Sequence, residues 1–440
     1  MDLARRHLPA AARGLAATVA VVLATVLLPA PAAPAATGVT VPRQFFGQHD
    51  SRPESWPRVT VGSVRLWDAG VTWRDIERTP GSYDWSRLDT LVRVARAKGA
   101  EITLTLGQTP TFRVAQPSTQ RPGCGEAPTN PYCARYGTGA TSMPNTNAWI
   151  AYVKEVAARY RGRIAALQVW NESNVPGFWS GTQAQMAELT YLAKRAVGSG
   201  MQIVSPSFVG RTNRSLISAY FAAKPHGQPV RNFFDKVGLS LYPAPTGTPE
   251  TSTEDTFGPL KVVQRILKKY KVNKPIWNTE INYGLASGGT GAKPPTISAD
   301  RQAAYVVRTY LLNADARIQR VFWYAWDLQS IGNTYLSTSS GSPTLAGKAV
   351  GLTASWVAKS RLKSCSRATK GATKGLFVCT LTYRGGVKRI YWNTHPTKRV
   401  KVTMPKTATY GISLYGKKTK IKGGSKKYVD YRPLLVRSKK

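Results

Sequence analysis

Two glutamates of this sequence stand where a carboxyl group can do chemistry. Glu172 follows the apolar run "ALQVW" at 166–170, and Glu280 ends the run "KPIWNTE" at 274–280. Both runs are typical of buried strands, where an unpaired acidic side chain is costly. Two carboxyl groups facing each other across a cleft can protonate a leaving oxygen and attack or activate water, which is the chemistry of glycosidic bond cleavage. Either glutamate alone could instead accept a loop hydrogen bond or cap a helix.

Eight short β-type runs alternate with helical stretches between about residues 40 and 335. They lie at 43–48, 61–67, 100–107, 164–170, 201–207, 236–243, 274–280 and 320–326. This rhythm predicts a (β/α)8 TIM barrel, in which the carboxyl ends of strands four and seven bring Glu172 and Glu280 to one mouth. A doubly wound open sheet is the alternative, but the segment "GQHDSRP" after the first run lacks the Gly-rich phosphate turn of that fold.

The sequence changes in character after about residue 340. Short β-type runs, such as "GLFVCTLTY" at 375–383, are separated by turns rich in Gly, Pro and Lys. This pattern predicts a small antiparallel β-sandwich. The expected organisation is therefore a signal peptide at 1–36, a catalytic barrel at 37–338 and a basic β-sandwich at 339–440.

The N-terminal segment has the pattern of an export signal. Arg5, Arg6 and Arg13 precede the apolar run 14–28, and "PAPAAPAA" at 29–36 offers Ala-x-Ala cleavage sites. The pattern predicts a cleaved secretory signal peptide, so we expect the protein to be secreted or associated with the cell wall. Retention as an N-terminal anchor is the alternative. No other segment is long enough for a membrane span, so no stable span is expected after cleavage.

Four cysteines fit an exported protein. Cys124 and Cys133 flank one short loop, and Cys365 and Cys379 flank a predicted hairpin. Local disulfides are the natural pairing, although spacing alone does not fix the connectivity. A zinc site is the alternative, but neither pair has CxxC spacing and the chain has only four histidines. We expect no metal and no cofactor.

The charge is strongly positive and unevenly distributed. The formal net charge is +40, and residues 336–440 carry 24 Lys and Arg against one acid, Asp430, a net charge of +23. Such a surface attracts polyanions, so we expect a partner such as an anionic cell-wall polymer, an acidic polysaccharide or nucleic acid. No signature of a specific nucleic-acid-binding fold is present. Solubility in a salty or acidic habitat is the alternative explanation.

The motif "WNE" at 170–172, with a glutamate ending strand seven, resembles the clan A glycoside hydrolases, a superfamily of retaining enzymes. The stretch 66–89, "LWDAGVTWRDIERTPGSYDWSRLD", is similar to the second strand and following helix of that clan. The resemblance covers about residues 43–335. With the terminal β-sandwich added, the chain is most similar to glycoside hydrolase family 39, and next to family 5.

The resemblance implies roles for particular residues. Glu172 would be the acid/base and Glu280 the nucleophile. Asn171 would form a hydrogen bond with the sugar 2-hydroxyl. Tyr242 would hold the nucleophile in place. Arg65 would keep the nucleophile ionised, because its positive charge lowers the pKa of a nearby carboxyl group. The remaining substrate-binding candidates are Trp323 under the cleaved sugar and, as weaker ones, His49, Gln108, Trp179, Tyr283, Trp326 and Asp327.

Several of these candidates have structural alternatives. Tyr242 and Trp323 could be core aromatics. Arg65 could pair with Asp68 or Glu101 for structural reasons alone, and His49 could be a solvated loop residue.

The expected function is that of a secreted glycosidase acting on a polysaccharide or oligosaccharide. Two alternatives use the same fold. One is a non-hydrolytic wall-binding protein built on a barrel scaffold. The other is a transglycosylase, in which a sugar replaces water as the acceptor.

Overall fold

The computed structural model describes residues 38–50, 52, 56–115, 139–243, 252–284, 296–327, 334–395 and 397–439. The predicted signal peptide at 1–36 lies outside these ranges, and so do Cys124 and Cys133. Their predicted cleavage and pairing therefore stay predictions.

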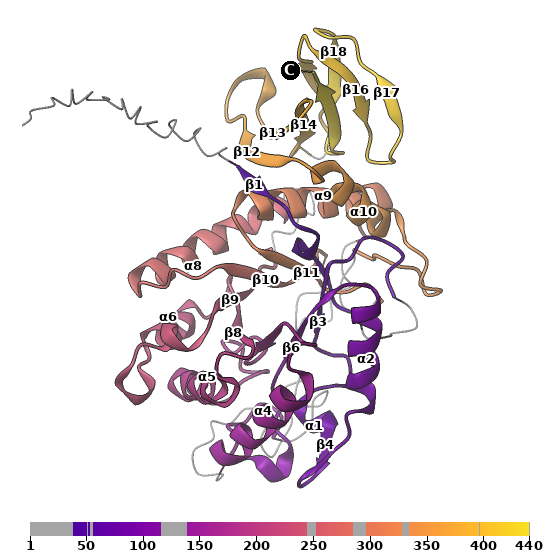
Figure 1. The fold of residues 1–440 in the computed structure, drawn as a ribbon. Coiled ribbons are helices and arrows are strands. Elements are labelled where there is room, and N and C mark those ends of the chain that lie inside the picture. The colour runs from indigo at the N-terminus through magenta and orange to yellow at the C-terminus, as the bar shows by residue number, and fades with distance from the viewer. Residues whose placement is uncertain are drawn as a thin grey trace, which may run out of the picture. The chain divides into compact units, whose positions relative to one another are not determined.

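Eight parallel strands close into a barrel in the order β10-β11-β2-β3-β6-β7-β8-β9 (Figure 1). Their bounds are β2 Phe46–Gln48, β3 Ser63–Leu66, β6 Glu101–Thr105, β7 Ala166–Gln168, β8 Gln202–Val209, β9 Lys236–Ser240, β10 Ile276–Ile281 and β11 Arg320–Trp323. Each strand lies within, or overlaps, one of the eight runs predicted from the sequence. The predicted (β/α)8 barrel is confirmed, and the open-sheet alternative is wrong because the sheet closes.

The long helices between the strands surround the barrel (Figure 1). They are α2 Ser86–Ala97, α4 Thr146–Tyr160, α5 Gln183–Val197, α6 Arg214–Ala222, α8 Phe257–Lys269, α9 Ala299–Asp315 and α10 Leu345–Val357. Local sequence sets their starts: the Asn145 side chain accepts hydrogen bonds from the first turn of α4, and Thr182 forms a capping box with Gln185 in α5. Helix α2 buries one apolar stripe, formed by Leu88, Leu91, Val92 and Ala95. Helix α9 is instead buried on all sides from Ala303 to Ala314.

Short elements decorate the barrel and its mouth. They are η1 Arg43–Phe45, α1 Trp73–Ile76, β4 Glu77–Thr79, β5 Ser82–Tyr83, η3 Thr111–Arg113, η5 Pro225–Gly227, η6 Val230–Phe233 and α7 Ser252–Asp255. The barrel interior changes along its axis. Ala166, Val204, Trp277 and Phe322 form a separate apolar cluster, whereas buried polar side chains gather towards the carboxyl ends of the strands. Buried polar side chains at the mouth therefore lie above a packed apolar cluster in the barrel interior.

The C-terminal strands form two antiparallel sheets. Their bounds are β12 Arg361–Arg367, β13 Leu376–Tyr383, β14 Gly386–Asn393, β15 Val400–Thr403, β16 Ala408–Ile412, β17 Lys418–Lys420, β18 Lys426–Val429 and β19 Leu434–Ser438, with η8 Gly371–Thr373 between β12 and β13. A seven-stranded sheet has the order β1-β12-β13-β14-β19-β16-β17, and β15 pairs with β18 as a separate ribbon. The predicted small antiparallel β-sandwich is confirmed.

Alternate residues of the seven-stranded sheet face two different cores. In β14, Ile390 and Trp392 belong to the core shared with the barrel, whereas Tyr391 belongs to a second cluster that includes Met404 and Val429. The period of two in a strand produces this division. The sheet is thus covered by the barrel helices on one face and by the β15–β18 ribbon on the other.

Two elements link the barrel with the C-terminal sheet across the predicted boundary at residue 338. The first strand of the described chain, β1 Val39–Thr40, pairs with β12 and so belongs to the C-terminal sheet. The helix that follows the last barrel strand is α10, which lies beyond residue 338. The C-terminal antiparallel strands begin at Arg361. Cys365 and Cys379 are opposite each other on β12 and β13 and form a disulfide, as the hairpin prediction implied.

A buried ion pair joins the barrel to the C-terminal sheet. Arg308 of α9 bonds to Glu254 of α7, and the Glu254 carboxylate also accepts a hydrogen bond from the Trp392 indole at 3.1 Å. Arg308 and Trp392 are fully buried. Removing one member would leave a buried polar group without its partner, so the contact fixes the sheet against the barrel.

Candidate active site

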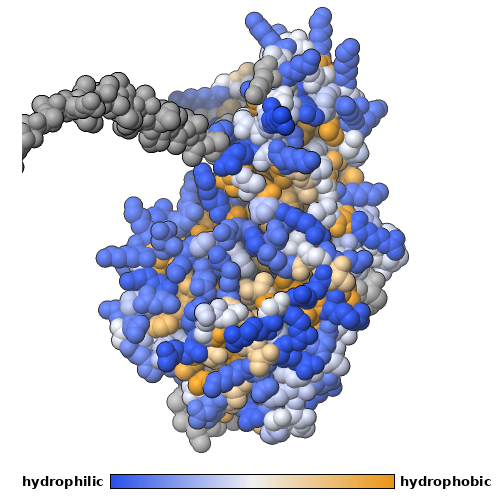
Figure 2. Space-filling view, viewed as in Figure 1, coloured by the Kyte–Doolittle hydropathy of each residue, from blue (hydrophilic) through white to orange (hydrophobic). Residues whose placement is uncertain are grey.

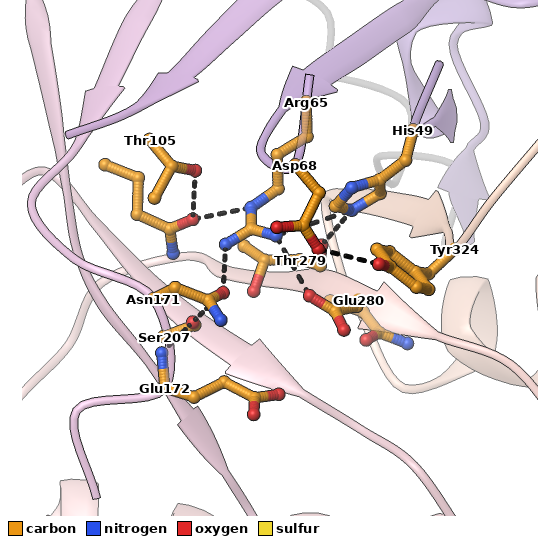
Figure 3. A network of polar contacts seen from close by, with 12 residues as sticks. His49, Arg65, Asp68, Thr105, Asn171, Glu172, Ser207, Thr279, Glu280 and Tyr324 are labelled. Carbon is orange, nitrogen blue, oxygen red and sulfur yellow. Dashed lines mark hydrogen bonds and ion pairs between the residues drawn. The ribbon is translucent and has the colours of Figure 1, made fainter. Parts of the chain in front are cut away.

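Glu172 and Glu280 lie at the same mouth of the barrel (Figure 3). Glu172 follows β7, and Glu280 lies in β10 opposite Ser240 of β9. Strands β8 and β9 separate β7 from β10 in the closed barrel, so the two side chains approach the mouth from different sides. They are 7% and 8% exposed, so both carboxyl groups are largely desolvated yet reachable from outside.

Three residues at the strand ends have a left-handed backbone. The φ angles are 43° at Glu172, 56° at Asp68 and 56° at Gln108, which follow β7, β3 and β6. Non-glycine residues rarely adopt this conformation, and it is found at sites where the surrounding structure imposes a direction on a side chain. The backbone thus turns at the points where these side chains reach the mouth.

Arg65 is the fully buried centre of the network. Its Nη1 donates to Glu280 Oε2 at 3.1 Å, its Nη2 to Asn171 Oδ1 at 2.7 Å and its Nε to Gln168 Oε1 at 2.7 Å (Figure 3). A buried guanidinium needs such acceptors, because an unpaired charge is very costly away from water. Arg65 therefore fixes residues from β7 and β10 in one arrangement.

The structural alternatives for Arg65 have other partners. Glu101 accepts from Arg320 at 2.8 Å, and Asp68 accepts from the Tyr324 hydroxyl at 2.7 Å. The buried ion pair of Arg65 is with Glu280.

Glu280 is held at both oxygens. Arg65 bonds to Oε2, and the Tyr242 hydroxyl donates to Oε1 at 2.7 Å. Burial raises the pKa of Glu280 above its usual value, and the Arg65 charge and the Tyr242 hydrogen bond offset only part of that rise. Two fixed oxygens leave this carboxylate with one defined orientation towards the mouth.

Glu172 has a different electrostatic environment. Burial raises its pKa to about 8, and the negative charge of Glu280 is the second cause. The Ser240 hydroxyl and the charges of Arg65 and Arg211 lower the pKa, but burial is the larger effect. At neutral pH, Glu172 therefore holds a proton that it can donate. The two glutamates thus form a pair whose protonation is coupled.

Hydrogen bonds from Arg65 and Ser207 hold the side-chain amide of Asn171, the residue before Glu172. The Asn171 Oδ1 accepts from Arg65 and, at 3.3 Å, from the Ser207 hydroxyl, which itself accepts the Glu172 N–H at 2.7 Å. Because a guanidinium can only donate, the atom that faces Arg65 must be the amide oxygen. The Asn171 NH2 group is therefore turned away from Arg65, as a donor.

His49 lies in the network and is 1% exposed, so the solvated alternative is wrong. Its Nε2 is 3.0 Å from the Thr279 carbonyl oxygen and 3.4 Å from Arg65 Nη1. Burial and then the Arg65 charge hold its pKa well below the usual value. The neutral ring is thus a fixed wall of the site.

Two residues of the mouth were absent from the predicted substrate-binding set. Tyr324 packs edge-on against His49, with ring centroids 4.9 Å apart, and donates its hydroxyl to Asp68. The charge of Asp68 also raises the pKa of Glu280. The signal for both was their position just beyond strand ends, after Leu66 of β3 and Trp323 of β11.

Trp323 and Tyr283 do not reach this site. Trp323 is fully buried in the main core, with its ring centroid 5.9 Å from Tyr283 and 6.3 Å from Tyr310. The Tyr283 hydroxyl bonds to Thr309 of α9 at 2.7 Å. The neighbouring Phe322 points into the barrel, so Trp323 points outwards to the helices by the alternation of the strand. This packing agrees with the alternative prediction that Trp323 is a core aromatic. Tyr242 is not simply a core aromatic, because its hydroxyl donates to Glu280.

The remaining candidates follow the strands in the sequence, and each contacts other residues of the chain. Trp179 is 3% exposed and packs edge-on against Trp170, with centroids 5.1 Å apart. Gln108 accepts from the Thr72 hydroxyl at 3.3 Å, and Asp327 pairs with Arg52 at 3.3 Å. Trp326 is 1% exposed, and its backbone N–H donates to the His49 carbonyl.

The described residues contain neither a metal-binding cluster nor a membrane-spanning helix. In those ranges, His, Cys, Asp and Glu side chains do not gather into a group that could hold a metal ion. Within the same ranges, the helices are too short or too polar to cross a membrane.

Solved structures with a similar fold are glycoside hydrolases. A family 39 glycoside hydrolase from Bacteroides cellulosilyticus matches with a TM-score of 0.64 and 16% identity, over 91% of this chain and 82% of the other. A family 39 β-xylosidase from Caulobacter crescentus matches with a TM-score of 0.60 and 16% identity, over 92% and 98%. A family 30 xylanase from Clostridium acetobutylicum matches with 0.59 and 12% identity, over 92% and 97%. The chain shares the (β/α)8 barrel fold of these glycoside hydrolases.

Sequence comparison adds nothing to this likeness. No protein-family model matches the chain, and no curated protein matches it. The likeness at 12–16% identity is one of fold, and it agrees with the resemblance of the "WNE" motif.

The raised pKa of Glu172 predicts a stability change in Glu172→Gln. A group whose folded pKa lies above its unfolded value stabilises the fold at low pH, and that stability is lost as pH rises through the folded value, here about 8. Glutamine stays neutral at every pH. At pH 9 we therefore expect the free energy of unfolding of the variant to exceed that of the unsubstituted protein by roughly 1 to 3 kcal/mol, whereas at pH 4 the two values should be similar. Urea unfolding at both pH values measures this. An equal difference at both pH values would contradict the assignment.

Proposed function

We propose that this protein is a secreted retaining glycoside hydrolase that cleaves O-glycosidic bonds of a polysaccharide or oligosaccharide. The observation that carries the proposal is the asymmetric pair at the mouth. Arg65 and Tyr242 hold both oxygens of Glu280, while burial keeps a proton on Glu172. A fixed carboxylate beside a protonated one is what double displacement at a sugar carbon requires. The glycoside hydrolase fold supports the same proposal.

In the first step, Glu280 attacks the anomeric carbon while Glu172 protonates the departing oxygen. The bond from sugar to leaving group breaks, and an ester between the sugar and Glu280 forms. Arg65 and Tyr242 position the attacking carboxylate. The Asn171 NH2 group would donate a hydrogen bond to the sugar 2-hydroxyl. This hydrogen bond would strengthen as positive charge develops on the ring.

In the second step, Glu172 takes a proton from water, which attacks the same carbon and releases the sugar from Glu280. The change of role follows from the coupling. Once Glu280 is esterified it carries no negative charge, so the second cause that raised the pKa of Glu172 is removed. Glu172, which has already given its proton to the leaving group, therefore stays ionised more readily and can act as a base.

The experiment that tests this function is a screen of aryl glycosides and polysaccharides, with the Glu172→Gln/Glu280→Gln double variant as the blank. For a cleaved substrate, proton NMR of the first-formed product identifies its anomer. We expect the anomer of the substrate, because two displacements at one carbon restore its configuration. An inverted first product would rule out the double displacement. Adding an acceptor sugar separates hydrolysis from transglycosylation, since only the latter yields a new glycoside as the main product.

A further inference from the structure

The outer face of the β15–β18 ribbon combines exposed basic side chains with an exposed aromatic ring. The ribbon covers one face of the seven-stranded sheet with Val402 and Val429, which pack in the second core. Its register pairs Lys401 with Tyr428 and Thr403 with Lys426. Directly opposite residues share a face, so these four side chains lie together on the side away from the core.

Tyr428 is the most exposed large hydrophobic residue in the described part of the chain, at 63%. The Lys401 ammonium lies 5.7 Å from the centroid of its ring. A tyrosine buried in the sheet would stabilise the sandwich, whereas most of this residue faces solvent, with Lys401 over its ring. Aromatic side chains with an apolar face and a wet edge are typical of recognition surfaces.

Positive charge surrounds this face. The exposed basic side chains on the ribbon and its flanking turns, besides Lys401 and Lys426, are Lys398, Arg399, Lys406, Lys422 and Lys427. The one acid of residues 336–440, Asp430, is bonded to Arg432 at 2.5 Å. Figure 2 shows hydrophilic side chains projecting from the part of the surface that the C-terminal strands form. The field over the ribbon is therefore positive and attracts polyanions.

We propose that the β15–β18 ribbon face binds an acidic polysaccharide and holds the chain on it. The Tyr428 ring would stack on the apolar face of a sugar ring, while Lys401 and Lys426 on either side would pair with carboxylates of neighbouring sugars. A polysaccharide is favoured over nucleic acid because the same chain carries the glycosidase site, so this choice of polyanion rests on the proposed function. The surface itself is separate from the barrel mouth.

The test measures binding of the full chain to polygalacturonate, with the fully methyl-esterified polymer as the uncharged ligand and a single-stranded DNA oligonucleotide as the competing polyanion. All proteins carry Glu280→Gln, so that binding is read without turnover and is independent of whether hydrolysis is found. We expect polygalacturonate to bind, the ester to bind at least about tenfold more weakly, and the affinity to fall with salt.

Two ribbon variants and one matched control locate the surface. Lys401→Gln/Lys426→Gln should raise the dissociation constant about tenfold and Tyr428→Ala about fivefold. The control Lys261→Gln/Lys268→Gln removes the same charge from exposed positions on α8 and should change it by less than about twofold. An equal loss in the control overturns the assignment to the ribbon. Tighter binding of DNA than of polygalacturonate, unchanged by Tyr428→Ala, overturns the assignment to a polysaccharide, and so does equal binding of the esterified polymer.

Discussion

Glu280→Ala should lower kcat/KM for glycoside hydrolysis by on the order of 10⁵-fold, because no other group can form the covalent intermediate. Added azide should restore part of the rate, since the shorter side chain leaves room for a small anion beside Arg65. The azide attacks directly in place of the missing carboxylate, so the glycosyl azide should have the inverted anomeric configuration. Rate constants with and without azide, and NMR of the product, measure both effects.

The structure supplies the control for this prediction. Glu280→Ala leaves Arg65 without the carboxylate partner of its buried ion pair, so a loss of folding could imitate a loss of chemistry. Glu280→Gln keeps an acceptor for Arg65 and should fold, stay inactive and resist azide rescue, because its amide fills the space. Rescue with retained configuration, or residual activity in Glu280→Gln close to that of the original chain, would show that another group is the nucleophile.

The barrel and its pair of glutamates were predictable because they depend on periodic, local signals. Alternation of apolar runs with amphipathic segments fixed the class of fold, and the ends of strands four and seven then fixed where Glu172 and Glu280 must meet. The contacts of Arg65 and Tyr242 with Glu280 agree with the resemblance to clan A.

The side-chain directions at the strand ends were harder to predict. Trp323 and Tyr324 are adjacent, and the strand period sends one to the helix layer and the other to the mouth. A sequence argument that places a residue only at the end of a strand is therefore uncertain by one position. The left-handed backbone at Glu172 adds a turn that its residue type does not signal, because glutamate is not among the residues enriched in that region.

The C-terminal boundary was obscured for a different reason. Strand β1 belongs to the C-terminal sheet only because it pairs with β12, a strand more than three hundred residues later in the chain. A two-residue strand carries no periodicity of its own. Only the completed sheet shows which domain it serves.

Glu172→Ala should slow substrates in proportion to how much their leaving group needs a proton. For an alkyl or sugar leaving group, we expect kcat/KM to fall by about 10² to 10⁴-fold, the usual contribution of a general acid. For a 2,4-dinitrophenyl glycoside, whose leaving group departs as a stable anion, glycosylation should be nearly unchanged. Azide should then accept the sugar from Glu280 and give the retained azide, opposite to the product of Glu280→Ala. An equal loss for both kinds of substrate would contradict the acid role.

Glu172→Ala should also change how kcat/KM depends on pH, because Glu172 carries the proton of the Glu172–Glu280 pair. In the original chain, Glu172 must be protonated to act as an acid, so kcat/KM for a poor leaving group should fall as pH rises through about 8. With the dinitrophenyl substrate and Glu172→Ala, that basic limb should disappear, because no proton is then required from the protein. A limb that persists unchanged would assign the ionisation to another group.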